Sequence, residues 1–161
     1  MKATKFLGQQ HREVEALFKQ LDKAKSAEPR RMLFDKIADA LAIHAAIEER
    51  HFYPALQDEV TDGTLLESLE EHLAIKRVIA DLLGLEGDDP TFLAKVKVLK
   101  DEIEHHVEEE ETGLFPKVER LFDEETLEAL AEEMEETANE LREDGNPRAA
   151  VLSETAYAAP L

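Results

Sequence analysis

The chain has 161 residues, no cysteine, and 38 acidic against 19 basic side chains, which give a formal net charge of −19. This acidity argues against nucleic acid and anionic membrane surfaces as partners, because both repel a strongly negative protein. The lack of cysteine excludes disulfides, thiolate metal sites and thiol catalysis. No signal peptide or membrane span is evident. We therefore expect one cytoplasmic domain, large enough to bury a core.

Helical periodicity dominates the sequence, and no segment shows the alternation of a β-strand. A first helix is expected over about residues 3–25, and a second begins near Pro29, since proline suits the first turn of a helix. Pro54 is expected to bend the end of this second helix, because its nitrogen cannot donate the hydrogen bond owed to the Arg50 carbonyl.

Three further helices are expected in the rest of the chain. Thr64 and Glu67 have the pattern of a capping box that opens the third helix, and Asp89 with Pro90 fits the start of the fourth. A fifth, amphipathic helix covers about residues 124–142. The expected organisation is a bundle over residues 1–122, a fifth helix packed on it over 123–143, and an irregular tail over 144–161.

The sequence contains an internal duplication. Its clearest copies are Ile43–Pro54 and His105–Pro116, in which a His precedes a Glu by four residues and a Pro follows that Glu by six. Positions 61 or 62 residues apart correspond, pairing His11 with His72, His44 with His106, and Glu48 with Glu110. Two repeated helical hairpins predict an all-α, up-down-up-down four-helix bundle, to which the fifth helix is added.

Six polar residues are expected to meet at one level of this bundle. On an α-helix a residue four positions further on lies about 40° past one full turn, so the His and Glu of each copy project from one stripe. Antiparallel helices place residues equidistant from their shared turn at the same height. By this rule the polar residues of all four helices lie at about the same height in the bundle. The candidate metal ligands are His11, His44, Glu48, His72, His106 and Glu110.

These residue types in one layer indicate a metal site. A lone His on an apolar stripe is usually a core residue with one hydrogen bond, but a buried carboxylate without a partner is costly. Four imidazoles and two carboxylates at one height are hard to satisfy without cations. Ligands of this kind without sulfur suit iron, manganese or zinc. Because carboxylates can bridge two ions, the pattern favours a dinuclear site over a single zinc.

The combined pattern resembles the hemerythrin-like (HHE cation-binding) domain family. The resemblance rests on His11–Glu15, the two His-x-x-x-Glu segments with their prolines, and Glu71-His72, and it covers about residues 3–121. It implies a four-helix bundle holding two iron ions, bridged by carboxylates and by an oxo or hydroxo group. The six residues above would then be the iron ligands.

The sequence departs from the oxygen-carrying hemerythrins at two places. They have a second His four residues after the His of the third helix, where this chain has Lys76, and a His-x4-Asp spacing where this chain has His-x3-Glu. With one His fewer, the irons would have more open positions. We therefore expect chemistry with peroxide, oxygen or nitric oxide, or iron sensing, in place of reversible oxygen carriage. No residue is assigned a catalytic role.

Four further polar residues are expected around the ligands. Glu15 and Lys76 correspond in the repeat, and they would pair with each other, hydrogen-bond a ligand, or lie at the surface. His51 is expected near the site, and His105 beside it or on the surface.

Three hypotheses remain open from the sequence. The first is a di-iron protein that binds or reacts with a small diatomic ligand or peroxide. The second is an iron- and oxygen-responsive sensor, signalling to a protein partner that the sequence does not identify. The third is a bundle whose polar layer holds zinc or no metal. The sequence also leaves open whether Tyr53 or Tyr157 approaches the iron.

Overall fold

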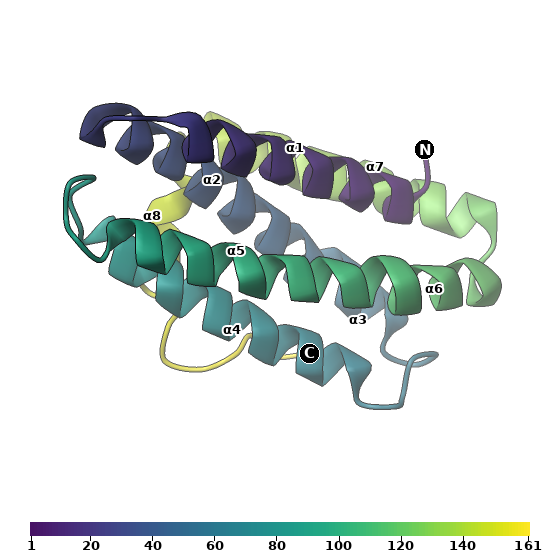
Figure 1. The fold of residues 1–161 in the computed structure, drawn as a ribbon. Coiled ribbons are helices and arrows are strands. Elements are labelled where there is room, and N and C mark those ends of the chain that lie inside the picture. Colours follow the sequence, from purple (N-terminus) through teal and green to yellow (C-terminus); the bar gives the residue numbers. More distant parts are fainter.

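The computed structural model describes residues 1–161 and contains helices but no strand. The all-α fold class is confirmed, and Figure 1 shows the four-helix arrangement with a further long helix, α7, against it. No helix of the chain is long and apolar enough to cross a membrane. The four long helices of the bundle are α1 (Ala3–Lys23), α2 (Ala27–Ile47), α4 (Thr64–Leu83) and α5 (Phe92–Glu109).

Two of these helices continue through a π-turn, which the sequence did not predict. The segments are η1 (Glu48–Phe52) leading into α3 (Tyr53–Leu56), and η2 (Glu110–Leu114) leading into α6 (Phe115–Leu121). In each, an N–H bonds to the carbonyl five residues earlier, Tyr53 to Glu48 and Phe115 to Glu110. The disturbance expected at Pro54 is therefore a widened turn just before the proline, which moves aside the carbonyl that its ring would strike.

The starts of α4 and α5 differ in detail from the expected caps. Helix α4 begins at Thr64, but its first amide is held by the Asp62 carboxylate at 3.1 Å and not by a capping box. Helix α5 begins at Phe92, because Asp89 accepts a hydrogen bond from the Thr91 amide at 2.8 Å and forms a turn ahead of the helix. A short acidic side chain two residues upstream thus takes the amide in both places.

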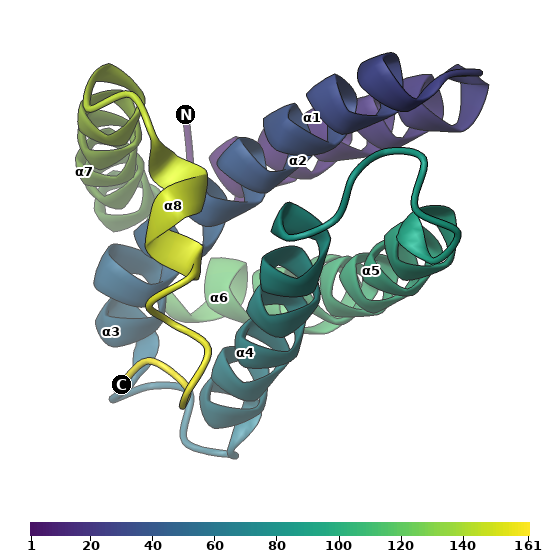
Figure 2. The ribbon, with the colours of Figure 1, turned by 90° about the vertical axis from the view of Figure 1, so that its left-hand side faces the viewer.

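Two helices lie outside the four-helix arrangement, α7 (Glu124–Glu143) and α8 (Pro147–Val151). Helix α7 packs against α1 and α2, and α8 contacts α2 and α4 (Figure 2). The short helix α8 falls within the tail that was expected to be irregular. Val151 is only 1% exposed, so this part of the tail is anchored in the core.

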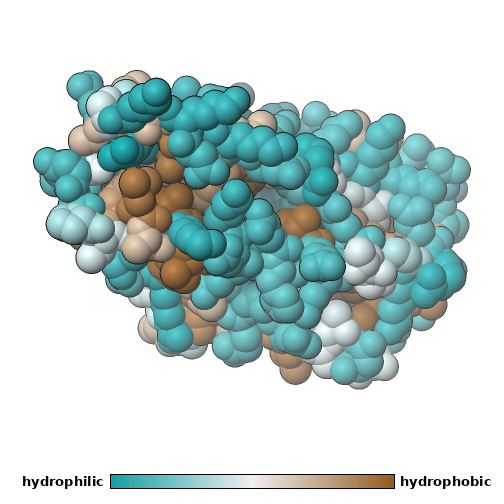
Figure 3. Space-filling view, viewed as in Figure 1, coloured by the Kyte–Doolittle hydropathy of each residue, from teal (hydrophilic) through white to brown (hydrophobic).

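The hydrophobic core is divided into two clusters along the bundle. One cluster includes Leu7 and Ile47, and the other includes Phe18 and Leu99. The candidate ligands occupy the polar layer between them. The face seen in Figure 3 is mostly hydrophilic, with hydrophobic side chains visible mainly toward its left-hand end.

Candidate metal centre

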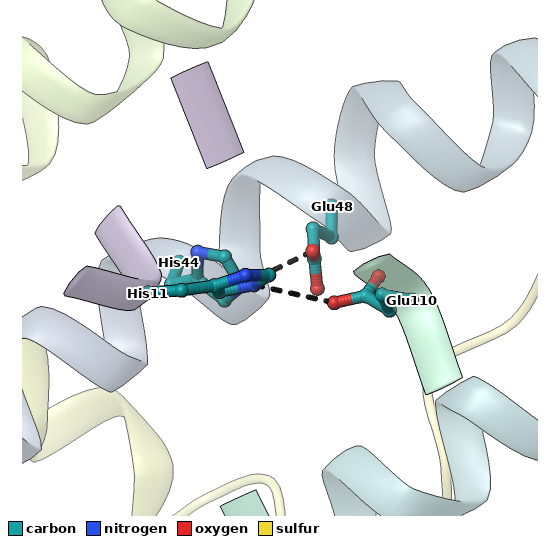
Figure 4. Close-up of side chains that lie close together, drawn as sticks. All are labelled: His11, His44, Glu48 and Glu110. Carbon is teal, nitrogen blue, oxygen red and sulfur yellow. Dashed lines mark hydrogen bonds and ion pairs between the residues drawn. The ribbon is translucent and has the colours of Figure 1, made fainter. Parts of the chain in front are cut away.

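The structure brings all six predicted ligands into one buried layer. None of them is more than 7% exposed, and their ligand atoms form two groups in which all atoms lie within 4.8 Å of one another. Figure 4 shows the first group, in which the two imidazoles face the two carboxylates. The groups are His11, His44, Glu48 and Glu110, and Glu48, His72 and His106. Glu48 belongs to both and joins them.

The imidazoles are arranged as two pairs. The Nε2 atoms of His11 and His44 are 3.2 Å apart, and those of His72 and His106 are also 3.2 Å apart. Two nitrogens held about 2.1 Å from one ion, roughly at right angles, would be separated by about 3 Å. Each pair therefore has the spacing of two ligands on a single ion.

The two carboxylates lie between these pairs. Glu48 has Oε1 3.1 Å from His44 Nε2 and Oε2 2.9 Å from His72 Nε2, so its two oxygens face different pairs. Oε1 of Glu110 is 3.4 Å from His11 Nε2 and 3.2 Å from His106 Nε2. This arrangement suits carboxylates that bridge two ions.

Each histidine is oriented by an acceptor behind it. The Nδ1 atoms donate, each at 2.8 Å, from His11 to Glu111, from His44 to Gln10, from His72 to Glu49, and from His106 to Glu71. These bonds put the proton on Nδ1 and direct the Nε2 lone pair into the pocket, as in metal-bound histidines.

The four acceptors also follow the duplication. Glu49 and Glu111 are 62 residues apart, and Gln10 and Glu71 are 61 apart. Each lies next to a candidate ligand in the chain. Sequence reasoning did not assign them this role, although that adjacency in both copies was a usable signal.

One oxygen of each carboxylate in the pocket lacks a hydrogen-bond donor. Oε1 of Glu48 and Oε1 of Glu110 are buried and have no hydrogen-bond partner. Buried carboxylate oxygens are expensive unless a donor or a cation satisfies them. The orphaned oxygens, facing imidazole lone pairs, therefore fit a site that holds positive charge.

The pKa shifts in the metal-free pocket agree with a site that holds positive charge. Burial raises the pKa of Glu48, but His44, followed by His106 and His72, brings it well below its ordinary value. Burial lowers the pKa of His106, but Glu110, Glu48 and Glu71 raise it well above its ordinary value. Both shifts have the same cause, because the buried carboxylates and the His106 ring stabilise each other's charged forms.

Tyr53 places a hydroxyl among the candidate ligands. Its oxygen donates to Glu48 Oε2 at 3.0 Å and Glu110 Oε2 at 3.1 Å, and it lies 3.2 Å from His72 Nε2. On a regular α-helix the residue five positions after Glu48 would be rotated about 140° from it, and the π-turn brings it back over Glu48. Tyr157, by contrast, is 78% exposed and lies outside the pocket.

Lys76 and Glu15 have different environments. Lys76 is buried and donates from Nζ to Glu49 at 2.8 Å, so it contacts the acceptor of His72. Glu15 lies on the surface, where it pairs with Arg12 at 3.6 Å. The two do not pair with each other.

His51 and His105 lie outside the inner layer. The Nε2 atom of His51 is 2.8 Å from the Thr137 hydroxyl of α7. His105 is exposed and lies 3.3 Å from Glu71 and 3.1 Å from Glu109. His105 therefore contacts Glu71, which is the acceptor of His106, and does not reach the pocket itself.

A small cavity of about 40 Å³ adjoins the histidine rings. Aliphatic side chains from α1, α2, α4 and α5 form most of its wall, and Lys76 and Val151 complete it. Since one water needs about 10–15 Å³ by this kind of measure, the cavity has room for a molecule of a few heavy atoms.

Comparison with known proteins gives three matches. The family model described as the hemerythrin HHE cation binding domain matches residues 2–118. A crystal structure of a hemerythrin HHE cation binding domain-containing protein from Mycobacterium kansasii has a TM-score of 0.81 and 25% identity, covering 95% of this chain and 98% of that one. A DNA nickase from a Nostoc species is 26% identical over 133 residues, or 83% of this chain. The chain spans only 38% of the nickase's length.

Proposed function

Because the chain belongs to the hemerythrin HHE cation-binding domain family, we propose that its buried layer holds two iron ions and that the protein binds or reacts with peroxide, oxygen or nitric oxide. The observation that carries this proposal is the pair of ligand groups joined by Glu48, with an orphaned oxygen on each carboxylate. A single tetrahedral zinc would use four donors and leave the others unsatisfied.

In this proposal the ligands divide between two positions. His11 and His44 would hold one ion, and His72 and His106 would hold the other, with Glu48 and Glu110 between the two pairs. Bound iron would supply one-electron redox chemistry and Lewis acidity. The Nδ1 bonds behind the four imidazoles hold their rings in place for this role.

Tyr53 contributes a further oxygen at the centre of the pocket. Burial, followed by the negative charges of Glu110 and Glu48, raises its pKa well above the ordinary value. In the metal-free protein the phenol therefore keeps its proton and donates to the two carboxylates. In the iron-loaded protein we expect the same oxygen to be available as a further ligand atom for the metal.

Lys76 and the cavity support reaction with a small molecule. The Lys76 ammonium bonds to Glu49, outside the ligand layer, at the place where oxygen carriers have a further histidine. A bound iron would thereby keep one coordination position for exogenous molecules, and the cavity beside the rings has room only for small ones. The net charge of −19 does not favour the DNA chemistry that the name of the Nostoc relative describes.

The test is the metal content and ultraviolet–visible spectrum of the purified protein, followed by its reaction with hydrogen peroxide, oxygen and nitric oxide. Two irons per chain, with charge-transfer bands that change on reaction, are expected. Zinc alone, or full folding without metal after growth on iron, would contradict the proposal. Repeated turnover of peroxide would indicate an enzyme, and a single stoichiometric reaction a sensor.

A further inference from the structure

The cavity beside the histidine rings has one wall that the four-helix bundle does not supply. Every other lining residue comes from α1, α2, α4 or α5, whereas Val151 comes from α8. Val151 is 1% exposed and packs in the hydrophobic core, so its position in this wall is a buried one. It also lies beyond residues 2–118, the part of the chain that the family model matches.

The cavity lies where α8 packs on the bundle. Helix α2 lines it with Leu41, His44 and two alanines, Ala42 and Ala45, whose side chains extend only a short way from the helix. Figure 2 shows α8 beside α2 and α4, and both helices contact it. Val151 therefore adds to the wall a side chain that the bundle itself does not supply.

The segment that carries Val151 is held by hydrogen bonds to both α2 and α4. On the α2 side, Asp39 accepts hydrogen bonds from the Arg148 amide at 3.1 Å and from the Arg148 guanidinium at 2.8 Å. On the α4 side, Arg77 donates to the Thr155 carbonyl at 2.9 Å. The position of the valine is thus fixed relative to both helices.

From these contacts we propose that Val151 sets the size of the molecule admitted to the candidate metal centre. This inference rests on the proposed function for its reactive ligand, but the cavity itself does not depend on a metal. A space of about 40 Å³ accepts hydrogen peroxide or a diatomic gas. It excludes an organic hydroperoxide with a branched alkyl group.

The first test measures the cavity directly in the metal-free protein, with xenon as probe and 129Xe NMR as readout. Val151→Ala enlarges an apolar cavity and should strengthen xenon binding, whereas Val151→Leu fills it and should weaken binding several-fold. Leu152→Ala is the matched control, because its side chain is 57% exposed, and it should change nothing. Unchanged xenon binding in both Val151 variants, with helical content intact, would overturn the inference.

The second test compares tert-butyl hydroperoxide with hydrogen peroxide on the iron-loaded protein. Val151→Ala removes two methyl groups and should raise the ratio of their rates about tenfold or more, since a mismatch of one methylene in a pocket typically changes discrimination by that amount. An unchanged ratio would count against the inference. If no variant or parent reacts with any peroxide, the proposed reactivity fails, and the xenon result alone decides the role of Val151.

Discussion

Tyr53 and Phe115 are repeat equivalents 62 residues apart, each directly after a π-turn, yet only Tyr53 reaches the buried carboxylates. The Phe115 ring instead lies parallel to the His11 ring, with centroids 5.8 Å apart. The two copies of the hairpin thus present a hydroxyl on one side of the pocket and a plain aromatic ring on the other.

Tyr53→Phe should therefore affect both forms of the protein. It removes the donor to two buried carboxylates, so the metal-free protein should lose about 1–3 kcal/mol of unfolding free energy. The visible spectrum of the iron-loaded protein should also shift. Urea denaturation and absorption spectroscopy measure these effects, with Tyr157→Phe as the exposed control. Unchanged stability and an unchanged spectrum would show that Tyr53 interacts with neither the carboxylates nor the metal.

His106 and His105 should behave differently although both precede a Glu by four residues. His106 points into the layer, whereas His105 is 63% exposed on its side chain. His106→Ala should lose iron, its charge-transfer bands and several degrees of melting temperature. His105→Ala should keep nearly all of its iron. The reverse pattern would show that the repeat alignment assigns the wrong histidine.

The acceptors behind the histidines should tune metal affinity. Glu49→Ala leaves the Nδ1 atom of His72 without its acceptor, and loss of such a partner typically costs about 10–100-fold in metal affinity. Glu71→Gln keeps an acceptor oxygen and copies Gln10, which already serves His44. Competition with a chelator should therefore show a large loss for the first variant and a small one for the second. Equal losses would mean that the carboxylate charge, and not the hydrogen bond, matters.

The pH should act in opposite directions on the metal-free and metal-loaded proteins. His11, His72 and His106 have pKa values raised above 6.5, with burial opposing the rise and the neighbouring carboxylates producing it. Their protonated forms stabilise the metal-free protein fully below the unfolded pKa, and this contribution is lost as pH rises through the folded values. Metal binding needs neutral imidazole and so strengthens as pH rises.

Calorimetry with and without a chelator checks this. The melting temperature of the loaded protein should exceed that of the metal-free protein by a margin that grows between about pH 6 and about pH 8. A margin of zero at every pH would show that no metal supports the fold.

The positions of the six candidate ligands were accessible from the sequence because two independent patterns agree on them. The four-residue spacing from His to Glu fixes a helix face, and the duplication fixes which histidine of the neighbouring pair His105 and His106 belongs to it. The all-α bundle followed from the same repeat.

The remaining features depend on packing that local patterns do not encode. Each π-turn inserts one residue and so shifts the inward-facing positions after it by one. Over the short segment that follows, this shift is too small a change in the hydrophobic pattern to predict the inward turn of Tyr53. Helix α8, which carries Val151, contacts α2 and α4, both more than 60 residues away in the chain, and a helix of five residues has no measurable period. The four Nδ1 acceptors, by contrast, were visible beside the ligands but resembled ordinary surface Glu and Gln.

In the proposed di-iron centre, the duplicated scaffold would also make the two ion positions electronically unequal. His72 and His106 both donate to carboxylates, Glu49 and Glu71. In the other pair only His11 does so, to Glu111, whereas His44 donates to the neutral amide of Gln10. A carboxylate behind an imidazole makes the ring a stronger electron donor. Iron beside His72 and His106 should therefore have the lower reduction potential. In a singly reduced pair, the ferrous ion would then reside beside His11 and His44.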